Sequence, residues 1–432
     1  MKLNVLLINP WIYDFAAYNM WSRPLGLLKV AEHLSQFDVE VKLIDCTDSF
    51  TIKKYGSGKF KAEIIEKPEL LKDIPLFYKR YGISIDEFVN RIKLSTPFDI
   101  VVITSIMGYW YPGIQKAIEI IRDIAGDVPI ILGGIYATIY HEHAVNNSNA
   151  DFIYKGHMNE SFNFALYTFG FKLKKKREQI PYYKLGLYRE YPFAPLLTAT
   201  GCPFRCSYCA SNLLYGKYQR HSVESVLKDI TELYSIGVRD FAFYDDALLF
   251  DADNHIKPIL KEIIKSGLDI RLHTPNGLHA RFLDEELAAL MKRAGFKTIR
   301  LSLETINADR QDKTGGKVSN EDLKKAVKFL KQQGFTKQDI GVYLMYGLPG
   351  QELEEVRAGA ELLKTLDVKI NLTEFSPIKG TEAFEELVNR GIINNDIDPL
   401  LTNNTVFSYL YSNYDMDELR NIKLDVKQYN SA

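Results

Sequence analysis

The sequence predicts an α/β protein with a doubly wound parallel sheet in its N-terminal part and a partial barrel of six β/α repeats in its C-terminal part. Short segments rich in Val, Ile and Leu alternate with segments of helical periodicity, and this alternation is typical of parallel sheets connected by helices. The length of 432 residues suits two domains and a tail. We expect domains at 1–171 and 195–390, a linker at 172–194, and a tail at 391–432 that covers the barrel.

The N-terminal sheet is expected to begin at residues 4–9, an apolar segment that ends at Pro10. The next strands are expected at 40–44, 100–105, 129–132 and 151–154, and helices at 24–35, 111–124 and 160–168. Ligands of such sheets bind at the carboxyl ends of the strands. The residues that follow the expected strands there are Asn9, Pro10, Ser105, Met107, Gly133 and Gly134.

Two segments do not fit a minimal doubly wound domain. Residues 50–95 are expected to form an insertion, either a cap over a site or a solvated excursion. The linker carries a basic run at 172–177, which is more often a solvated connector than a nucleic-acid surface.

The C-terminal part is expected to place strands at 195–200, 240–244, 269–273, 298–303, 340–346 and 369–374. Helices between them are expected at 222–236, 284–294, 320–333 and 353–366. The count of six repeats is two short of a closed eight-fold barrel, and sites of such barrels form at the carboxyl ends of the strands. The first of these strands leads directly into a loop that contains three cysteines.

Cys202, Cys206 and Cys209 have the spacing CxxxCxxC in that loop. Cysteine thiolates are the usual ligands of iron–sulfur clusters, and three of them can hold three irons of a cubane and leave the fourth without a protein ligand. Structural zinc would need four ligands, and the only other cysteine is Cys46, far upstream. Four cysteines in so long a chain also make a disulfide framework a poor alternative.

This loop resembles the cluster loop of the radical S-adenosylmethionine (SAM) superfamily, with Tyr208 just before the third cysteine. The resemblance implies a [4Fe-4S] cluster whose open iron chelates SAM, and reductive cleavage of SAM to a 5′-deoxyadenosyl radical that abstracts hydrogen from a substrate. It also implies an electron donor such as flavodoxin or ferredoxin. In that superfamily the partial barrel carries the reaction.

The same resemblance implies a SAM-binding set at the strand ends. Ser302 and Glu304 alternate, which predicts that both face one side of their strand, where a buried carboxylate needs a partner; the family uses these positions for ribose. Adjacent acids at a strand tip are as often a helix cap as a ligand. The full set is Phe204, Tyr208, Asp245, Asp246, Asn276, Ser302, Glu304, Gly347, Phe375 and Ser376. Arg281, Arg300, His273 and His279 are left without a firm role.

The N-terminal half resembles the cobalamin-binding domain that precedes many radical SAM barrels. The resemblance implies cobalamin contacts at Asn9, Pro10, Ser105, Met107, Gly133, Gly134 and Gly156. The Asp-x-His-x-x-Gly element is missing, so a cobalt here would have no histidine from it, and the later Gly-x-Gly-Glu is altered. The alternative for Gly133 and Gly134 is a strand-to-helix turn.

The formal net charge of −1 argues against electrostatic binding of nucleic acid or an anionic membrane. No apolar stretch has the length of a membrane span or a signal peptide, so a cytoplasmic, low-oxygen location is expected. Three functions stay open: a SAM-cleaving enzyme that acts with cobalamin, for instance as a methyltransferase; a cobalamin-free enzyme of elimination or rearrangement; and a non-catalytic redox module. The substrate is not predicted.

Overall fold

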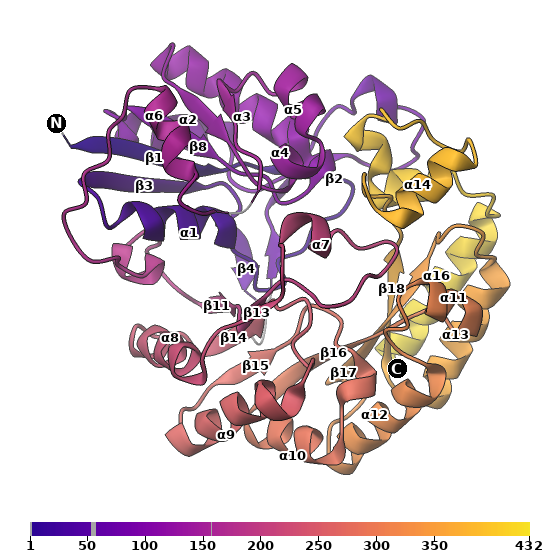
Figure 1. The fold of residues 1–432 in the computed structure, drawn as a ribbon. Coiled ribbons are helices and arrows are strands. Elements are labelled where there is room, and N and C mark those ends of the chain that lie inside the picture. Colours follow the sequence, from indigo (N-terminus) through magenta and orange to yellow (C-terminus); the bar gives the residue numbers. More distant parts are fainter. Residues whose placement is uncertain (1, 53–57, 157) are drawn as a thin grey trace. The chain divides into compact units, whose positions relative to one another are not determined.

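The computed structural model describes residues 2–52, 58–156 and 158–432. The chain folds into two compact units (Figure 1), the first made of Met1–Tyr191 with Asp398–Leu401 and the second of Pro192–Ile397 with Thr402–Ala432. The two parallel sheets expected from the sequence are both present, one in each unit. No helix among the described residues is long and apolar enough to span a bilayer.

The N-terminal unit is built on a five-stranded parallel sheet in the order β10–β9–β8–β1–β3. Its strands are β1 (Leu3–Asn9), β3 (Val39–Asp45), β8 (Ile100–Ile103), β9 (Ile130–Leu132) and β10 (Phe152–Ile153). The strand order reverses between β1 and β8, because β3 follows β1 on one side and β8 lies on the other. Such a reversal is where open α/β sheets bind ligands.

Helices on both faces bury this sheet. On one face α1 (Leu25–Leu34) and α6 (Phe162–Thr168) share a core with alternate residues of β1 and β8. In Figure 1 α3 (Tyr111–Ala125) lies on the opposite side of the sheet from α1, and it packs against α2 (Ile85–Ser95). Two short helices, α4 (Ile135–Ile139) and α5 (His141–Asn147), follow β9.

The insertion expected at 50–95 is narrower than the sequence suggested. The helix α2 at its end is the crossover between the parallel strands β3 and β8, and it packs against β3, since parallel neighbours need such a connection. Part of the remainder joins the segment after β1 in a three-stranded antiparallel sheet, and another part forms a separate two-stranded sheet. These strands are β2 (Ile12–Asp14), β4 (Phe50–Ile52), β5 (Gly58–Phe60), β6 (Ala62–Ile64) and β7 (Lys79–Tyr81), in the sheets β2–β7–β6 and β4–β5. The Gly-Ser-Gly sequence of this insertion predicts a turn, and residues 53–57, up to its Ser57, lie outside the described residues.

The predicted linker is packed rather than free. Arg177 donates a hydrogen bond from Nε to the Ser35 carbonyl, and the Tyr188 hydroxyl donates to Asp45 Oδ2 at 2.7 Å. Both contacts lie within the N-terminal unit, whose boundary falls after Tyr191.

The C-terminal unit contains a six-stranded parallel sheet in the order β11–β14–β15–β16–β17–β18, as the six repeats predicted. Its strands are β11 (Phe193–Leu196), β14 (Asp240–Phe243), β15 (Arg271–His273), β16 (Phe296–Glu304), β17 (Ile340–Tyr346) and β18 (Lys369–Glu374). The connecting helices are α8 (Val223–Ser235), α9 (Ile256–Ser266), α10 (Glu285–Arg293), α12 (Asn320–Gln332) and α13 (Leu353–Thr365). The strand order ends at β11 and β18, so the barrel is open.

One strand departs from the expectation. The segment predicted as a single strand at 195–200 is divided into β11 and β12 (Ala199–Thr200), and β12 pairs antiparallel with β13 (Gln219–Arg220). The physical reason is Asp245, which takes the backbone N–H groups of Thr198 and Ala199 that a continuous strand would direct to its neighbour.

The segment 391–432, predicted as a tail that covers the barrel, consists of three parts with different contacts. Residues 398–401 belong to the N-terminal unit. The helix α15 (Asn404–Leu410) packs with α14 (Glu382–Asn389) in an apolar cluster that includes Phe375 at the end of β18. The last helix, α16 (Met416–Ser431), lies against α13 and the edge strand β18.

Candidate functional site

The three cysteines lie on the loop between β12 and the short helix α7 (Ser211–Leu214). Cys202 is buried, Cys206 is half-buried and Cys209 is exposed. The loop is closed by a hydrogen bond from the Cys209 N–H to the Cys206 carbonyl at 3.0 Å, and the Ser211 N–H points to Cys209 Sγ at 3.4 Å. The sequence therefore folds locally so that all three thiols lie on one short turn.

The sulfurs influence one another electrostatically. Burial raises the pKa of Cys202 and Cys206 to about 11, and neighbouring cysteines add to the rise. The pKa of Cys209 is raised as well, because the surrounding loop partly desolvates its thiol although the residue as a whole is exposed. Thiols in such surroundings ionise when a metal stabilises the thiolate. The described residues contain no group of three His, Cys, Asp or Glu side chains that could hold one metal ion. In a cubane cluster each of the three thiolates binds a different iron. The three cysteines therefore fit a cluster although their sulfurs do not surround one metal ion.

Two aspartates hold the cysteine loop at its two ends. Asp245 Oδ1 accepts hydrogen bonds from the Thr198 N–H at 2.9 Å, the Thr198 hydroxyl at 2.6 Å and the Ala199 N–H at 2.6 Å. Asp246 Oδ2 accepts from the Ser211 hydroxyl at 2.5 Å. Both acids were predicted to contact SAM. The structure gives each of them a loop-positioning role.

Asp245 keeps one oxygen without a hydrogen-bond partner in the described part of the chain, its Oδ2. Burial raises the pKa of this carboxyl to about 7, against the opposing effect of the hydrogen bonds from Thr198 and Ala199. If Asp245 contacts SAM as predicted, Oδ2 is the oxygen that remains for this contact.

Ser302 and Glu304 lie at the end of β16, which is less regular there than the sequence predicted. The register of β16 against β17 shifts between these two residues, and Glu304 has a φ of 63°. The bulge re-aims the strand end, as bulges beside functional sites often do, so simple alternation does not describe this pair. Ser302 is buried, and its hydroxyl has no partner among the described residues.

Lys317 is the residue of this region that sequence reasoning missed. Its Nζ lies 3.5 Å from Glu304 Oε1, and its charge lowers the pKa of Cys206 and Cys209. Its loop, between α11 (Ala308–Lys313) and α12, passes so close to the cysteines that a Cβ on Gly315 would lie 3.2 Å from Cys206 Sγ. The signal in the sequence was the pair of glycines before the lysine.

Tyr208 is packed beside these groups. Burial raises the pKa of its hydroxyl well above the ordinary value, and the nearby Glu304 carboxylate raises it further. The structure therefore brings Tyr208, Glu304, Lys317 and the cysteine loop together, of which three were predicted.

Phe204 and Asn276 have mainly packing roles. The Phe204 ring is stacked near Phe282 at a centroid distance of 5.9 Å, and the Arg281 guanidinium lies 4.8 Å from its centroid. Asn276 Nδ2 donates to the Tyr244 carbonyl at 2.8 Å, which fixes the end of β14. His279 packs on Phe204, and burial with the charges of Lys317 and Arg281 lowers its pKa to about 2. A neutral, packed imidazole agrees with leaving it without a role.

The ends of β17 and β18 face the residues of the C-terminal segment. Gly347 has a φ of 88°, and its N–H donates to the Tyr414 hydroxyl at 3.0 Å. The Ser376 hydroxyl donates to the Thr402 carbonyl at 2.6 Å, and Phe375 is buried. Their contact with adenine stays a prediction, and the Ser376 side chain is already engaged.

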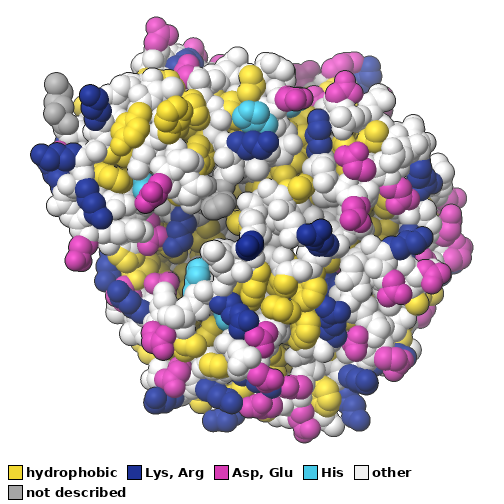
Figure 2. All heavy atoms as spheres, viewed as in Figure 1, with side chains coloured by type: hydrophobic (Ala, Val, Ile, Leu, Met, Phe, Trp, Pro, Cys, Tyr) yellow, Lys and Arg dark blue, Asp and Glu magenta, His cyan; other side chains and the backbone are white. Residues whose placement is uncertain are grey.

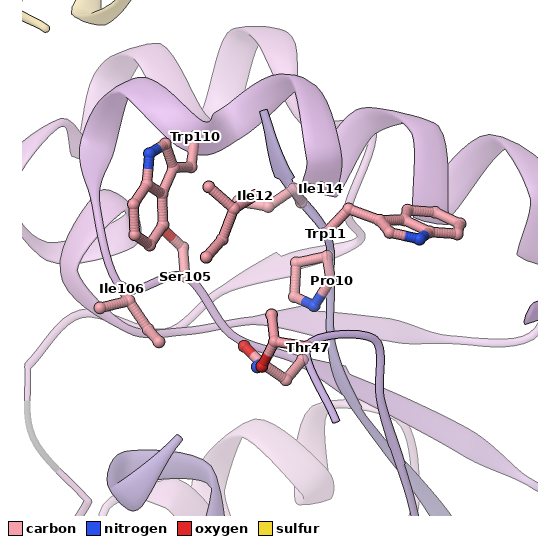
Figure 3. A pocket seen from close by; sticks show the side chains of 9 residues that line it. Pro10, Trp11, Ile12, Thr47, Ser105, Ile106, Trp110 and Ile114 are labelled. Atoms are coloured by element: carbon pink, nitrogen blue, oxygen red, sulfur yellow. The ribbon is translucent and has the colours of Figure 1, made fainter. Parts of the chain in front are cut away.

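In the N-terminal unit a small cavity lies at the strand reversal between β1 and β8 (Figure 3). Its volume is about 10 Å³, which is room for one water molecule. Side chains from β1 and β2, the end of β8 and α3 line it, as Figure 3 shows: Asn9, Pro10, Trp11, Ile12, Thr47, Ser105, Ile106, Trp110 and Ile114.

The seven residues predicted to contact cobalamin fall into two groups. Asn9 donates from Nδ2 to Asp45 Oδ1 at 2.8 Å, Ser105 donates to the Met107 carbonyl, and a Cβ on Gly134 would lie 2.4 Å from the Ser105 carbonyl oxygen. Gly134 also has a φ of 90° at the start of α4, so it forms the strand-to-helix turn that was the alternative for it. Asn9, Pro10 and Ser105 line the small cavity. The other group is less enclosed: Met107 is exposed, a Cβ on Gly133 would lie 3.9 Å from the Tyr154 ring, and a Cβ on Gly156 would meet no described atom within 4 Å.

Comparison with known proteins finds a family similarity within the C-terminal unit. Residues 196–363 match the Radical SAM superfamily. An uncharacterized methyltransferase of Pyrococcus horikoshii is 29% identical over 205 residues, which cover 47% of this chain and 43% of that protein. A tryptophan 2-C-methyltransferase of Streptomyces laurentii is 25% identical over 203 residues, 43% of this chain and 33% of that protein. The matched segments span less than half the length of these curated relatives.

Two solved structures share the fold over nearly the whole chain. The radical SAM methyltransferase TsrM of Kitasatospora setae, solved with tryptophan and a SAM analogue, is 18% identical, with a TM-score of 0.66 over 90% of this chain and 76% of that one. The cobalamin-dependent SAM radical enzyme OxsB, solved with aqua-cobalamin and SAM, is 13% identical, with a TM-score of 0.55 over 99% of this chain and 61% of that one.

Proposed function

We propose that this chain, which carries a radical SAM domain at residues 196–363, reductively cleaves SAM and abstracts a hydrogen atom from a small-molecule substrate. The observation that carries the proposal is the cysteine loop: three thiols on one turn, held at both ends by Asp245 and Asp246. A purely structural zinc site would need a fourth protein ligand to complete its coordination.

Cys202, Cys206 and Cys209 would hold the cluster. When bound, such a cluster supplies the electron that cleaves SAM into methionine and a 5′-deoxyadenosyl radical. Lys317 lies close enough to these cysteines to lower their pKa values, so it balances negative charge in the loop. A protein electron donor such as flavodoxin or ferredoxin, and a reducing compartment such as the cytoplasm, suit this chemistry.

Other residues of this chain would bind and orient SAM. The Ser302 hydroxyl is buried and lacks a partner in the described residues, and Glu304 ends the same strand. A buried hydroxyl without a partner costs about 1–3 kcal/mol, which a bound ribose would offset. This cost argues against the third function considered, a non-catalytic redox module, since such a module has no use for an unfilled polar position.

The test is anaerobic reconstitution with iron and sulfide, followed by reduction in the presence of SAM. We expect bound iron and sulfide and the formation of 5′-deoxyadenosine. Zinc as the bound metal, or a cluster without SAM cleavage, would contradict the proposal.

Cobalamin-dependent methyl transfer is the second candidate. It is supported by the fold shared with TsrM and OxsB, by the exposed Met107 and by the space beside Gly156 in the described part of the chain. Both residues follow strands of the N-terminal sheet at their carboxyl ends, where such sheets bind ligands. Cobalt content after reconstitution with hydroxocobalamin separates this candidate from the cobalamin-free one.

A further inference from the structure

Arg300 is a cation on the concave side of the open barrel. Its neighbours along β16, Ile299 and Leu301, are fully buried, so Arg300 faces the opposite side of the sheet from them. In the register of the sheet Arg300 is paired with Gly341 of β17, which is paired with Lys369 of β18. This row therefore brings two cations and a glycine side by side.

Neither cation has an acidic partner. In the part of the chain that the structure describes, no carboxylate forms an ion pair with Arg300 or Lys369 within 4.0 Å. Arg300 Nε has no hydrogen-bond partner among the described residues, Nη1 donates to the Ile299 carbonyl at 3.3 Å, and the polar side chain beside the guanidinium is the Tyr343 phenol. Burial lowers the pKa of both groups, and the charge of Arg300 lowers that of Lys369 further, while the Asp339 carboxylate raises it. An uncompensated cation in this position costs stability.

The neighbouring row of the sheet carries two more polar atoms without partners. Asn371 Oδ1 and Ser302 Oγ have no hydrogen-bond partner among the described residues. A Cβ on Gly341 would lie 2.4 Å from Asn371 Oδ1 and 2.7 Å from Arg300 Nη1, so the lack of a side chain at Gly341 lets the guanidinium and the amide pack directly against the strand. Tyr343 lies between Ser302 and Asn371 in that row, and its hydroxyl donates to the Pro275 carbonyl at 2.6 Å.

Other arginines of the unit show what a structural role looks like. Arg271 donates from Nε to Asp240 Oδ1 at 2.8 Å, and Arg310 pairs with Glu355 at 3.2 Å. Each has an acid close by. Arg300 differs from both in this respect, because it is held in place while its charge is unmatched.

We infer that Arg300, with Lys369, binds the carboxylate of the substrate. The inference rests on the proposed function and narrows its substrate class to small carboxylic acids. Arg300 is two residues before Ser302, about 7 Å along the strand, so a carboxylate at Arg300 places a carbon a few bonds away beside the position proposed for SAM. A guanidinium fork also suits a carboxylate geometrically.

Formate, the smallest carboxylate, is the probe. The melting temperature of the reconstituted enzyme with SAM is measured in sodium formate and in sodium chloride at equal ionic strength. We expect formate to raise the melting temperature by at least about 2 °C and Arg300→Gln to abolish that rise. Because this change removes an unmatched cation, we also expect the variant in chloride to melt no lower than the wild type.

Arg271→Gln is the matched control. It breaks the pair with Asp240, so it should melt lower and keep the formate effect. Arg300→Lys should retain part of the effect, and Lys369→Gln should weaken it, which keeps the test decisive if Arg300→Gln folds poorly. No formate-specific rise in the wild type, or the same rise in Arg300→Gln, would overturn the inference.

The formate experiment distinguishes a failure of the carboxylate site from a failure of the proposed function. A wild-type enzyme that forms no 5′-deoxyadenosine but shows the Arg300-dependent formate effect would refute SAM cleavage and leave the carboxylate site. The opposite pair of results would refute the carboxylate site alone.

Discussion

Cys202, Cys206 and Cys209 differ in exposure, yet we expect them to act as one set because each holds a different iron of one cluster. Replacing any one by alanine should remove the brown cluster absorbance and lower the rate of SAM cleavage by at least about a hundredfold, the cost typical of losing a catalytic group. Cys46→Ala is the control, since Cys46 is buried in the N-terminal unit. Loss of the cluster in Cys46→Ala would indicate a fourth protein ligand.

We expect Ser302 to contribute to SAM binding rather than to the stability of the fold. Its hydroxyl is buried and has no partner in the described residues, so Ser302→Ala should leave the free energy of unfolding of the SAM-free protein unchanged or raise it by up to about 1–3 kcal/mol, while raising the KM for SAM. Ser319, which caps α12 in a capping box, is the control: Ser319→Ala should cost about 1 kcal/mol and leave the KM unchanged. A large stability loss in Ser302→Ala with an unchanged KM would contradict this assignment.

At the scale of elements, Asp245 joins the end of β14 to the start of the cysteine loop. Its folded pKa of about 7 lies above the ordinary value near 4, so between these pH values the folded state binds more protons than the unfolded state. The stability contributed by protonated Asp245 is therefore full below about pH 4 and lost as the pH rises through about 7. Asp245→Asn should flatten this part of the stability–pH curve measured by urea unfolding.

Asp269→Asn is the comparison for that experiment, because Asp269 is exposed in the same unit. It should leave the curve unchanged. A curve of the same slope in Asp245→Asn and the wild type would mean that another group titrates.

The helix α16 protects the edge of the barrel sheet. Asn430 accepts a hydrogen bond from the Ile370 N–H at 3.0 Å and donates to its carbonyl at 2.8 Å, which satisfies the free edge of β18. Unpaired edges promote aggregation. Asn430→Ala should cost about 1–2 kcal/mol and increase light scattering on heating, whereas Asn421→Ala, exposed on the same helix, should do neither.

Elements with strong local patterns could be predicted, and those set by distant contacts could not. The strands β17 and β18 were predicted with their correct bounds, because β17 is a mainly apolar segment and β18 alternates polar and apolar residues. The division of β11 from β12 depends on Asp245, which is far away in sequence. The bulge before Glu304 and the place of Lys317 beside the cysteines depend in the same way on packing that no short pattern records.

On the scale of the whole molecule, the chain combines two units with separate cores. Their fold class followed from the alternation of strands and helices, and the cofactor chemistry followed from three cysteines. Figure 2 shows acidic and basic side chains interspersed over the visible face, in keeping with a net charge of −1. The unmatched charge of Arg300 could not be predicted, because its meaning depends on which side chains surround it in three dimensions.

One iron of the cluster is expected to have no protein ligand and to bind SAM instead. Electron paramagnetic resonance of the reduced, reconstituted enzyme tests this most directly. Three cysteine ligands predict a [4Fe-4S] spectrum that shifts when SAM is added, because SAM coordinates the remaining iron. A spectrum that is the same with and without SAM, from a cluster of full iron content, would contradict the account.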